Sequence, residues 1–249
     1  MKVFFSSFFI YTSLLHSQDG LNGTGGASVG INDTGGLPFS ASPYLFQDIK
    51  SNLIGKDGDF EISLDDILGS PYLYEDFQQG VIRDMLEETY RKVFVRYNIF
   101  NDDFQIKYDS PHSKAYNLIK DPKVRVELNY KTFVYKTFID ENKEVVEGFL
   151  ELFYFDEYIS IFKRYRKKLD LPKKAETSLH KDIPGRFVDK NSFFVSKGLQ
   201  IVVLPENRKT IINFFPNHKE ELEHYIKNER LRFKKEEDVK KLIRYYKSL

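Results

Sequence analysis

The stretch Gly148-Phe-Leu-Glu-Leu-Phe-Tyr-Phe-Asp-Glu-Tyr-Ile-Ser-Ile-Phe-Lys-Arg-Tyr-Arg166 decides the fold expected for this chain. Its two flanks are rich in aromatic and branched residues, which suit a pleated, half-buried surface. Opposed aromatic side chains add about 0.2–1 kcal/mol per cross-strand pair. We therefore predict a long β-hairpin that turns at Asp156 and Glu157 and lies at the centre of the fold.

Short β-branched or aromatic segments recur at spacings of about 8–15 residues, with turn residues between them and no helical pattern from Arg91 to Leu204. This series predicts a mainly β (α+β) fold, built on an antiparallel meander sheet or an open barrel-like sheet. The predicted strands are Arg91–Tyr97, Phe104–Tyr108, Val124–Tyr130, Lys131–Phe138, Phe149–Phe155, Tyr158–Tyr165, Ser192–Ser196, Gln200–Leu204 and Lys209–Phe214.

Two helices are predicted at the C-terminal end. Pro216 suits a first helical turn, and Leu222, Tyr225 and Ile226 follow at helical spacing. Lys235 to Ser248 repeats the same period. Each helix has one narrow apolar stripe, so we expect the pair to pack on the sheet or to cover its edge.

The N-terminal region predicts export. Residues 1–18 contain Lys2, an apolar run and a short polar exit, which together resemble a secretory signal peptide cleaved near Gln18. Residues 19–40 form a Gly-rich leader, and residues 41–249 are expected to form one β-rich domain that includes the helix pair. A buried N-terminal strand is the alternative for the apolar run.

No later stretch approaches 18 apolar residues, so no transmembrane segment is expected in the mature chain. The absence of cysteine excludes disulfides, thiolate metal sites and a cysteine nucleophile. An exported chain without disulfides favours a periplasmic or extracellular location in bacteria, although sequons beginning at Asn22 and Asn32 leave a eukaryotic secretory route open.

Charge is unevenly distributed along the chain. Asp19 to Ser160 carries a net charge of −11 and Ile161 to Leu249 carries +11, although the whole chain has a net charge of only +1. The two halves either neutralise each other across the fold or leave a basic face for an acidic partner or an anionic envelope surface.

An internal similarity links Ser42-Pro-Tyr-Leu-Phe-Gln-Asp-Ile with Ser70-Pro-Tyr-Leu-Tyr-Glu-Asp-Phe. Each Ser-Pro is expected to fix a turn that delivers Tyr and Leu onto an apolar surface. Two copies are too few for a solenoid, which needs about three repeats. A duplicated docking peptide is the functional alternative.

Motifs that match by letters lack the structural context that their chemistry needs. Gly26-Ala-Ser-Val-Gly30 spells a nucleophile elbow but lies in the Gly-rich leader. His218 and His224 are six residues apart and fall on opposite helix faces, unlike zinc ligands. The segment Lys56 to Asp66 resembles a calcium loop but has Phe60 in place of the turn glycine. No cofactor, metal or catalytic residue is therefore predicted.

A basic run with an interleaved aromatic residue follows the predicted hairpin and is the candidate interaction surface. Such a run can bind an anionic polymer, lipid headgroups or an acidic protein, and it can also be a solvated hairpin end. Nucleic acid is not expected, because an exported protein seldom meets it. The candidate residues are Lys163, Arg164, Tyr165, Arg166, Lys167 and Lys168.

Several motifs together resemble a widespread group of secreted proteins of Bacteroidota. They are Ser70-Pro-Tyr-Leu with Phe77 and Gly80, Lys163-Arg-Tyr, Phe215-Pro-x-x-Lys219-Glu-Glu-Leu with Tyr225-Ile-Lys, and Glu237-Asp-Val-Lys-Lys-Leu with Tyr245-Tyr. The resemblance covers roughly Gly69 to Leu249 and implies a periplasmic or extracellular location. It implies no functional residue, because the group has no assigned activity.

We expect a non-enzymatic binding or accessory protein of the bacterial cell envelope, whose partner is an envelope or outer-membrane protein or an anionic surface. One alternative is a carrier of an apolar ligand or lipid, enclosed by a curved sheet and a helical lid. Another is a hydrolase whose nucleophile, base and orienting residue come from separate strands.

Overall fold

The computed structural model describes residues 39–40, 67–110, 112–173 and 181–249 of the 249-residue chain. All of them belong to one compact unit, Ile31–Leu249. The predicted signal peptide, almost all of the Gly-rich leader, the first Ser-Pro-Tyr-Leu copy and the calcium-loop-like segment lie outside the described residues. Those interpretations stay predictions.

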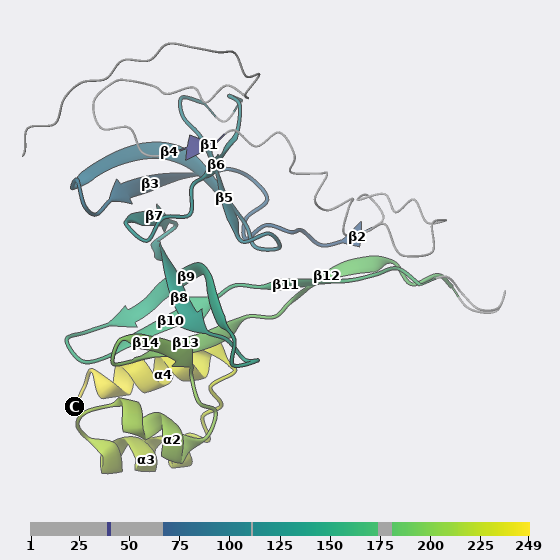
Figure 1. Ribbon diagram of the computed structural model, residues 1–249. Coiled ribbons are helices and arrows are strands. Elements are labelled where there is room, and N and C mark those ends of the chain that lie inside the picture. The colour runs from purple at the N-terminus through teal and green to yellow at the C-terminus, as the bar shows by residue number, and fades with distance from the viewer. Residues whose placement is uncertain (1–38, 41–66, 111, 174–180) are drawn as a thin grey trace, which may run out of the picture. The chain divides into compact units, whose positions relative to one another are not determined.

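The fold is mainly β, as predicted, and its largest element is an eleven-stranded sheet (Figure 1). Every strand pairing within this sheet is antiparallel. In spatial order the strands are β1 (Phe39–Ser40), β6 (Tyr116–Leu118), β5 (Asp103–Lys107), β4 (Thr89–Asn98), β3 (Gln78–Asp84), β7 (Val124–Leu128), β8 (Lys131–Ile139), β9 (Val145–Phe155), β10 (Ser160–Arg164), β13 (Ser192–Lys197) and β14 (Gln200–Val203).

The predicted central hairpin is confirmed as β9 and β10, which pair from Phe155 opposite Ser160 to Glu151 opposite Lys163. The carboxylate of Asp156 fixes the turn between them. It accepts the backbone N–H groups of Tyr158 and Ile159, both at 2.8 Å. A side chain that bonds the backbone two and three residues ahead is a common way to close a turn, so Asp156 sets the register of the hairpin.

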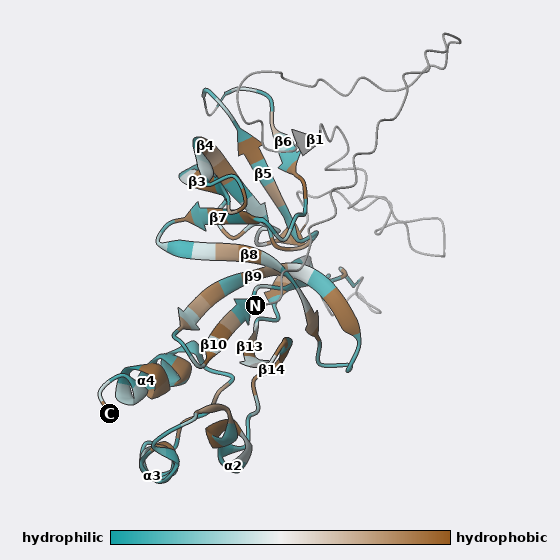
Figure 2. Cartoon of the chain, turned by 60° about the vertical axis from the view of Figure 1, so that its left-hand side comes forward, coloured by the Kyte–Doolittle hydropathy of each residue, from teal (hydrophilic) through white to brown (hydrophobic). Residues whose placement is uncertain are grey.

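Strands β8 and β9 each bury both faces, because successive side chains of a strand point to opposite sides. Phe133 and Phe149 enter one apolar cluster, called here the first core. Their neighbours Val134 and Leu150 enter a separate cluster, called the second core. The sheet curls around the first core: Phe104 of β5 lies 4.8 Å from Phe149 between ring centroids, although four strands separate β5 from β9. The alternation of apolar colour along the strands is visible in Figure 2.

A third core, called here the helical core, lies between the last strands of the sheet and the C-terminal helices (Figure 1). Ile161 and Phe193 contribute to it from β10 and β13, and Leu222 and Leu242 from two helices. The two predicted helices are confirmed as α3 (Lys219–Asn228) and α4 (Glu236–Tyr246). Their apolar stripes are buried in this core, as the helical period predicts.

One predicted strand is wrong. Lys209–Phe214 forms the short helix α2 (Arg208–Ile211) followed by the 3-10 helix η2 (Ile212–Phe214). The side chain of Asn207 accepts the N–H of Lys209 at 2.9 Å and caps the first turn. Ile211 is fully buried in the helical core. Capping and burial therefore outweigh the β preference of this Ile-rich segment.

A small second sheet was not predicted. It contains β11 (Lys167–Asp170), β12 (Gly185–Asp189) and β2 (Ile67–Leu68), in that order from the end at β11. The β12–β2 pair is parallel, which departs from the prediction of antiparallel pairing throughout. Strands β11 and β12 extend together as a two-stranded ribbon (Figure 1).

The second Ser-Pro-Tyr-Leu copy docks beside β4, as its predicted turn requires. The carbonyl oxygen of Pro71 accepts the N–H of Ile99 at 2.9 Å, and the N–H of Leu73 donates to the carbonyl of Tyr97 at 2.9 Å. The side chain of Leu73 packs against the first core. The guanidinium of Arg96 lies 3.9 Å from the Tyr72 ring centroid, so this segment is held by backbone, apolar and cation–π contacts.

Candidate functional site

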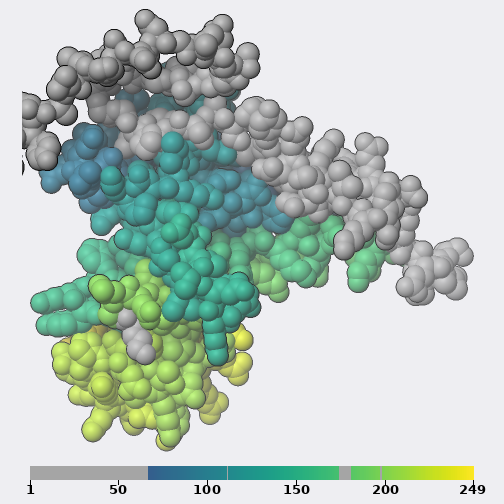
Figure 3. Space-filling model, viewed as in Figure 1, coloured from purple at the N-terminus to yellow at the C-terminus, as the bar shows by residue number. Residues whose placement is uncertain are grey.

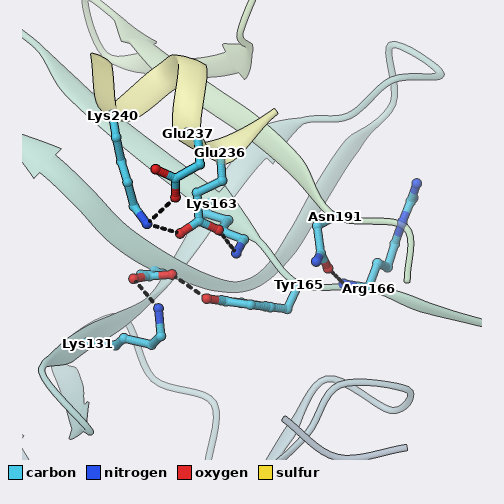
Figure 4. Close-up of polar contacts among 9 residues, drawn as sticks. Lys131, Lys163, Tyr165, Arg166, Asn191, Glu236, Glu237 and Lys240 are labelled. Carbon is cyan, nitrogen blue, oxygen red and sulfur yellow. Dashed lines mark hydrogen bonds and ion pairs between the residues drawn. The ribbon is translucent and has the colours of Figure 1, made fainter. Parts of the chain in front are cut away.

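The predicted interaction surface at residues 163–168 is largely occupied by contacts within the protein (Figure 4). Lys163 and Tyr165 are each only 6% exposed and therefore do not lie on the surface. They point into the fold because both belong to the face of the hairpin that packs between the first core and the helical core. A basic run in a strand is divided between two faces.

Lys163, Tyr165 and three partners form a buried polar cluster, called here the polar seam. The hydroxyl of Tyr165 donates to Glu151 Oε2 at 2.7 Å, and Lys131 Nζ donates to Glu151 Oε1 at 2.9 Å. Lys163 Nζ lies 4.2 Å from the Tyr165 ring centroid and donates to Glu236 Oε2 at 2.5 Å. The seam thus connects the sheet with the first turn of α4.

The charges of the seam stabilise one another. Burial opposes ionisation of Glu236, but hydrogen bonds from Lys163 and Lys240 outweigh it and lower the pKa of Glu236 to about 2. Burial, followed by the neighbouring Glu151 carboxylate, raises the pKa of Tyr165 far above its usual value. Tyr165 is therefore a neutral hydrogen-bond donor at physiological pH. These ionisation states suit a structural network that joins two cores.

The remaining residues of the run reach separate partners. Arg164 lies over the Phe138 ring, with 4.8 Å from its guanidinium carbon to the ring centroid. Arg166 pairs with Glu141 at 3.5 Å, and Lys167 and Lys168 pair with Asp189 and Asp170. Three of the four are engaged by carboxylates. The run therefore does not present six free side chains on one continuous surface.

A different basic surface lies among the helices, and we take it as the candidate functional site. It is an open groove of about 610 Å³ where the start of α2 meets the end of α3 and the loop before α4. We call it the basic groove. The helical part of the chain that bears it is yellow-green in the space-filling view (Figure 3). Its lining residues are Glu206, Asn207, Arg208, Lys209, Ile226, Lys227, Arg230, Leu231 and Arg232.

Four cations at the rim of the basic groove are exposed and take part in none of the ion pairs found among residues 67–110, 112–173 and 181–249. They are Lys209, Lys227, Arg230 and Arg232. The other two charged groups are engaged close by: Arg208 approaches Glu223 at 3.9 Å, and Glu206 pairs with Lys234 at 3.1 Å. The basic groove therefore has an excess of uncompensated positive charge.

The end of α3 builds this arrangement. The N–H of Leu231 donates to the carbonyl of Ile226 at 3.1 Å, and the N–H of Arg230 donates to that of Lys227 at 3.3 Å. This pattern is a Schellman motif, in which the left-handed position is usually glycine. Arg230 occupies it here with φ of 51°. The motif buries Ile226 and Leu231 in the helical core and leaves Arg230 exposed among the residues that line the groove.

Helix polarity explains only part of this charge. A cation near a helix C-terminus is stabilised by the helix dipole, which accounts for Lys227 and Arg230. Lys209 comes instead from the short helix α2, and Arg232 lies beyond the end of α3. Convergence of cations from separate segments is an arrangement suited to an acidic partner.

Among the described residues, no group of three or more His, Cys, Asp or Glu side chains is arranged to hold a metal ion. In the same part of the chain, no helix has the length and apolar character needed to cross a membrane.

Only an indirect signal for the basic groove is present in the sequence. The +11 charge of residues 161–249 is compatible with a basic face in this half and also with neutralisation by the acidic half. The groove residues come from residues 206–209 and 226–232, so no single basic run marks them. Comparison of the chain with protein-family models, with curated proteins and with solved structures found no match.

Proposed function

We propose that the chain is a non-enzymatic binding protein of a bacterial cell envelope that holds an acidic protein partner in the basic groove. The single observation that carries this proposal is the cluster of four unpaired cations, Lys209, Lys227, Arg230 and Arg232, around the basic groove. Envelope location rests on the signal-like residues 1–18 and on the resemblance to secreted proteins of Bacteroidota.

The cations of the basic groove favour an acidic partner. Two apolar residues of its lining, Ile226 and Leu231, are only 3% and 8% exposed, so charge and not apolar contact makes the main contribution. The cations speed the encounter and set its orientation, and they contribute less as salt screens them. The preferred ligand is therefore an acidic protein segment.

The alternative of an apolar-ligand carrier has less support. The interior of the curl formed by β8, β9, β10, β13 and β14 is filled by the rings of Phe138, Phe162 and Phe194, with Val134 and Leu150 beside them. Phe138 and Phe194 pack edge to face with ring centroids 4.9 Å apart. A carrier needs an enclosed apolar space of several hundred cubic ångströms, on the order of 300–1,000 Å³, and these aromatic side chains occupy the expected place.

The test measures binding of fluorescein-labelled poly-L-glutamate by anisotropy at low salt. The groove variant replaces Lys209, Lys227 and Arg232 by Ser and Arg230 by Gly. We expect at least a tenfold loss of affinity, because four uncompensated cations are removed from one site. Wild-type binding should also weaken as NaCl rises.

The matched control replaces four other exposed lysines by Ser and therefore changes the net charge equally. Its positions, Lys92, Lys143, Lys190 and Lys219, lie outside the basic groove and outside the ion pairs of the described residues. We expect this variant to retain affinity within about threefold, because it loses only long-range attraction. Equal losses in both variants would mean that the overall charge, and not the groove, attracts the polymer.

A further inference from the structure

The turn between β3 and β4 has the composition that the basic groove suits. It is called here the acidic tip and comprises Asp84, Met85, Leu86, Glu87 and Glu88. Met85 is 44% exposed and Leu86 is 68% exposed. Glu87 and Glu88 are also exposed, and neither takes part in an ion pair found in the described part of the chain.

Hydrogen bonds hold the acidic tip in one conformation. Asp84 Oδ1 accepts the N–H of Leu86 at 2.8 Å and that of Glu87 at 3.1 Å. The N–H of Met85 donates to the carbonyl of Lys123 at 2.9 Å, which ties the turn to the neighbouring loop. A turn that is already ordered loses less conformational entropy when it binds, so its side chains are suited to docking.

Arg83, which precedes Asp84, is engaged by Glu127 at 2.5 Å and lies 5.2 Å from the Tyr90 ring centroid. Glu87 and Glu88 therefore keep two free carboxylates. The basic groove has the opposite pattern, with four free cations.

We propose that the acidic tip of one molecule docks in the basic groove of a second copy of the same chain. Glu87 and Glu88 of the tip face the four exposed cations of the groove. This inference rests on the proposed function of the groove and names its partner. The net charges of −11 and +11 in the two parts of the chain are consistent with such a contact between unlike surfaces.

The two surfaces belong to different cores: the acidic tip extends strands of the first core, and the basic groove belongs to the helical core. A contact between unlike patches is heterologous, so each added molecule leaves one tip and one groove free. Assembly then continues into open chains or closed rings. A two-fold dimer, in which both copies use the same patch, is not expected.

Sedimentation equilibrium tests this inference through two variants that disable opposite sides. The tip variant is Glu87→Lys with Glu88→Lys, and the groove variant is Lys227→Glu with Arg232→Glu. All four positions carry exposed charges without ion pairs in the described part of the chain, so the fold should persist. In 50 mM NaCl the wild-type average mass should rise with concentration. Each variant alone should associate at least tenfold more weakly.

An equimolar mixture of the two variants gives the decisive result. One intact tip and one intact groove remain in the mixture, so it should form a complex of twice the chain mass and nothing larger. A wild-type protein that stays monomeric, variants that assemble like the wild type, or a mixture that stays monomeric would each overturn the inference. If the wild type is monomeric but still binds poly-L-glutamate, the proposed function stands and only the self-association is refuted. If the wild type neither self-associates nor binds poly-L-glutamate, both proposals are refuted.

Discussion

The polar seam makes a quantitative prediction for Glu236→Gln. This substitution removes the charge that faces Lys163, whose ammonium group is in a side chain only 8% exposed. Breaking a fully buried ion pair costs about 3–5 kcal/mol because one charge stays buried without a partner. The Glu236 side chain is 31% exposed, and the Tyr165 ring still faces the ammonium group, so we discount the cost to about 2 kcal/mol.

Urea denaturation measures this loss, and Glu237→Gln is its matched control. Glu237 lies one residue further along α4 and is 71% exposed, and its partner is Lys240 at 3.0 Å. Its substitution should cost less than about 0.5 kcal/mol. Adding Lys163→Met to Glu236→Gln should recover most of the lost stability, because no buried charge is then left unpaired. Equal costs for the two Glu→Gln substitutions would refute the role given to the seam.

The same pair predicts a pH dependence with a definite sign. The pKa of Glu236 is lowered from its ordinary value of 4.5 to about 2 in the folded protein. Its contribution to stability is therefore complete above pH 4.5 and is lost as the pH falls toward 2. After allowance for solvent screening we expect this loss to be about 1–2 kcal/mol. The stability difference between the wild type and Glu236→Gln should shrink over this pH range, and a constant difference would contradict the assignment.

Three further substitutions test other parts of the account. Arg230→Gly should raise the free energy of unfolding by about 0.5–1 kcal/mol, because glycine suits a left-handed φ of 51°, while weakening poly-L-glutamate binding; a loss of stability would contradict the strain at this position. Gly148→Ala should cost about 2 kcal/mol or more in urea denaturation, because an added Cβ would lie 2.7 Å from Asp102 Oδ2, and an unchanged urea midpoint would contradict this close approach. Arg96→Met should cost about 1–2 kcal/mol in thermal denaturation, because it removes the cation between Tyr72 and Phe77 and two hydrogen bonds to Gln105; an unchanged melting temperature would contradict that role.

The sheet could be predicted from sequence because its strongest signals are local. The alternating aromatic residues on each side of Asp156 define the central hairpin, and the helical period defines α3 and α4. Lys209–Phe214 was predicted as a strand because Ile211 and Ile212 favour β structure. The segment forms α2 instead, because Asn207 caps the helix and the isoleucines are buried in the helical core.

The candidate site could not be located from sequence for two physical reasons. A basic run in or beside a strand alternates between faces, which placed Lys163 and Tyr165 inside the protein. The basic groove, in contrast, gathers Lys209 from one segment and Arg230 from another. Sequence reveals the excess of positive charge in this half of the chain, but only folding brings the separated cations together.

Mapping of amide chemical shifts during titration with poly-L-glutamate tests the central claim most directly. The largest shifts should come from the backbone amides of Lys209, Lys227, Arg230, Leu231 and Arg232. These shifts should disappear in 0.5 M NaCl. Shifts centred on residues 163–168, or spread evenly over the basic half of the chain, would contradict the claim that the basic groove is the binding site.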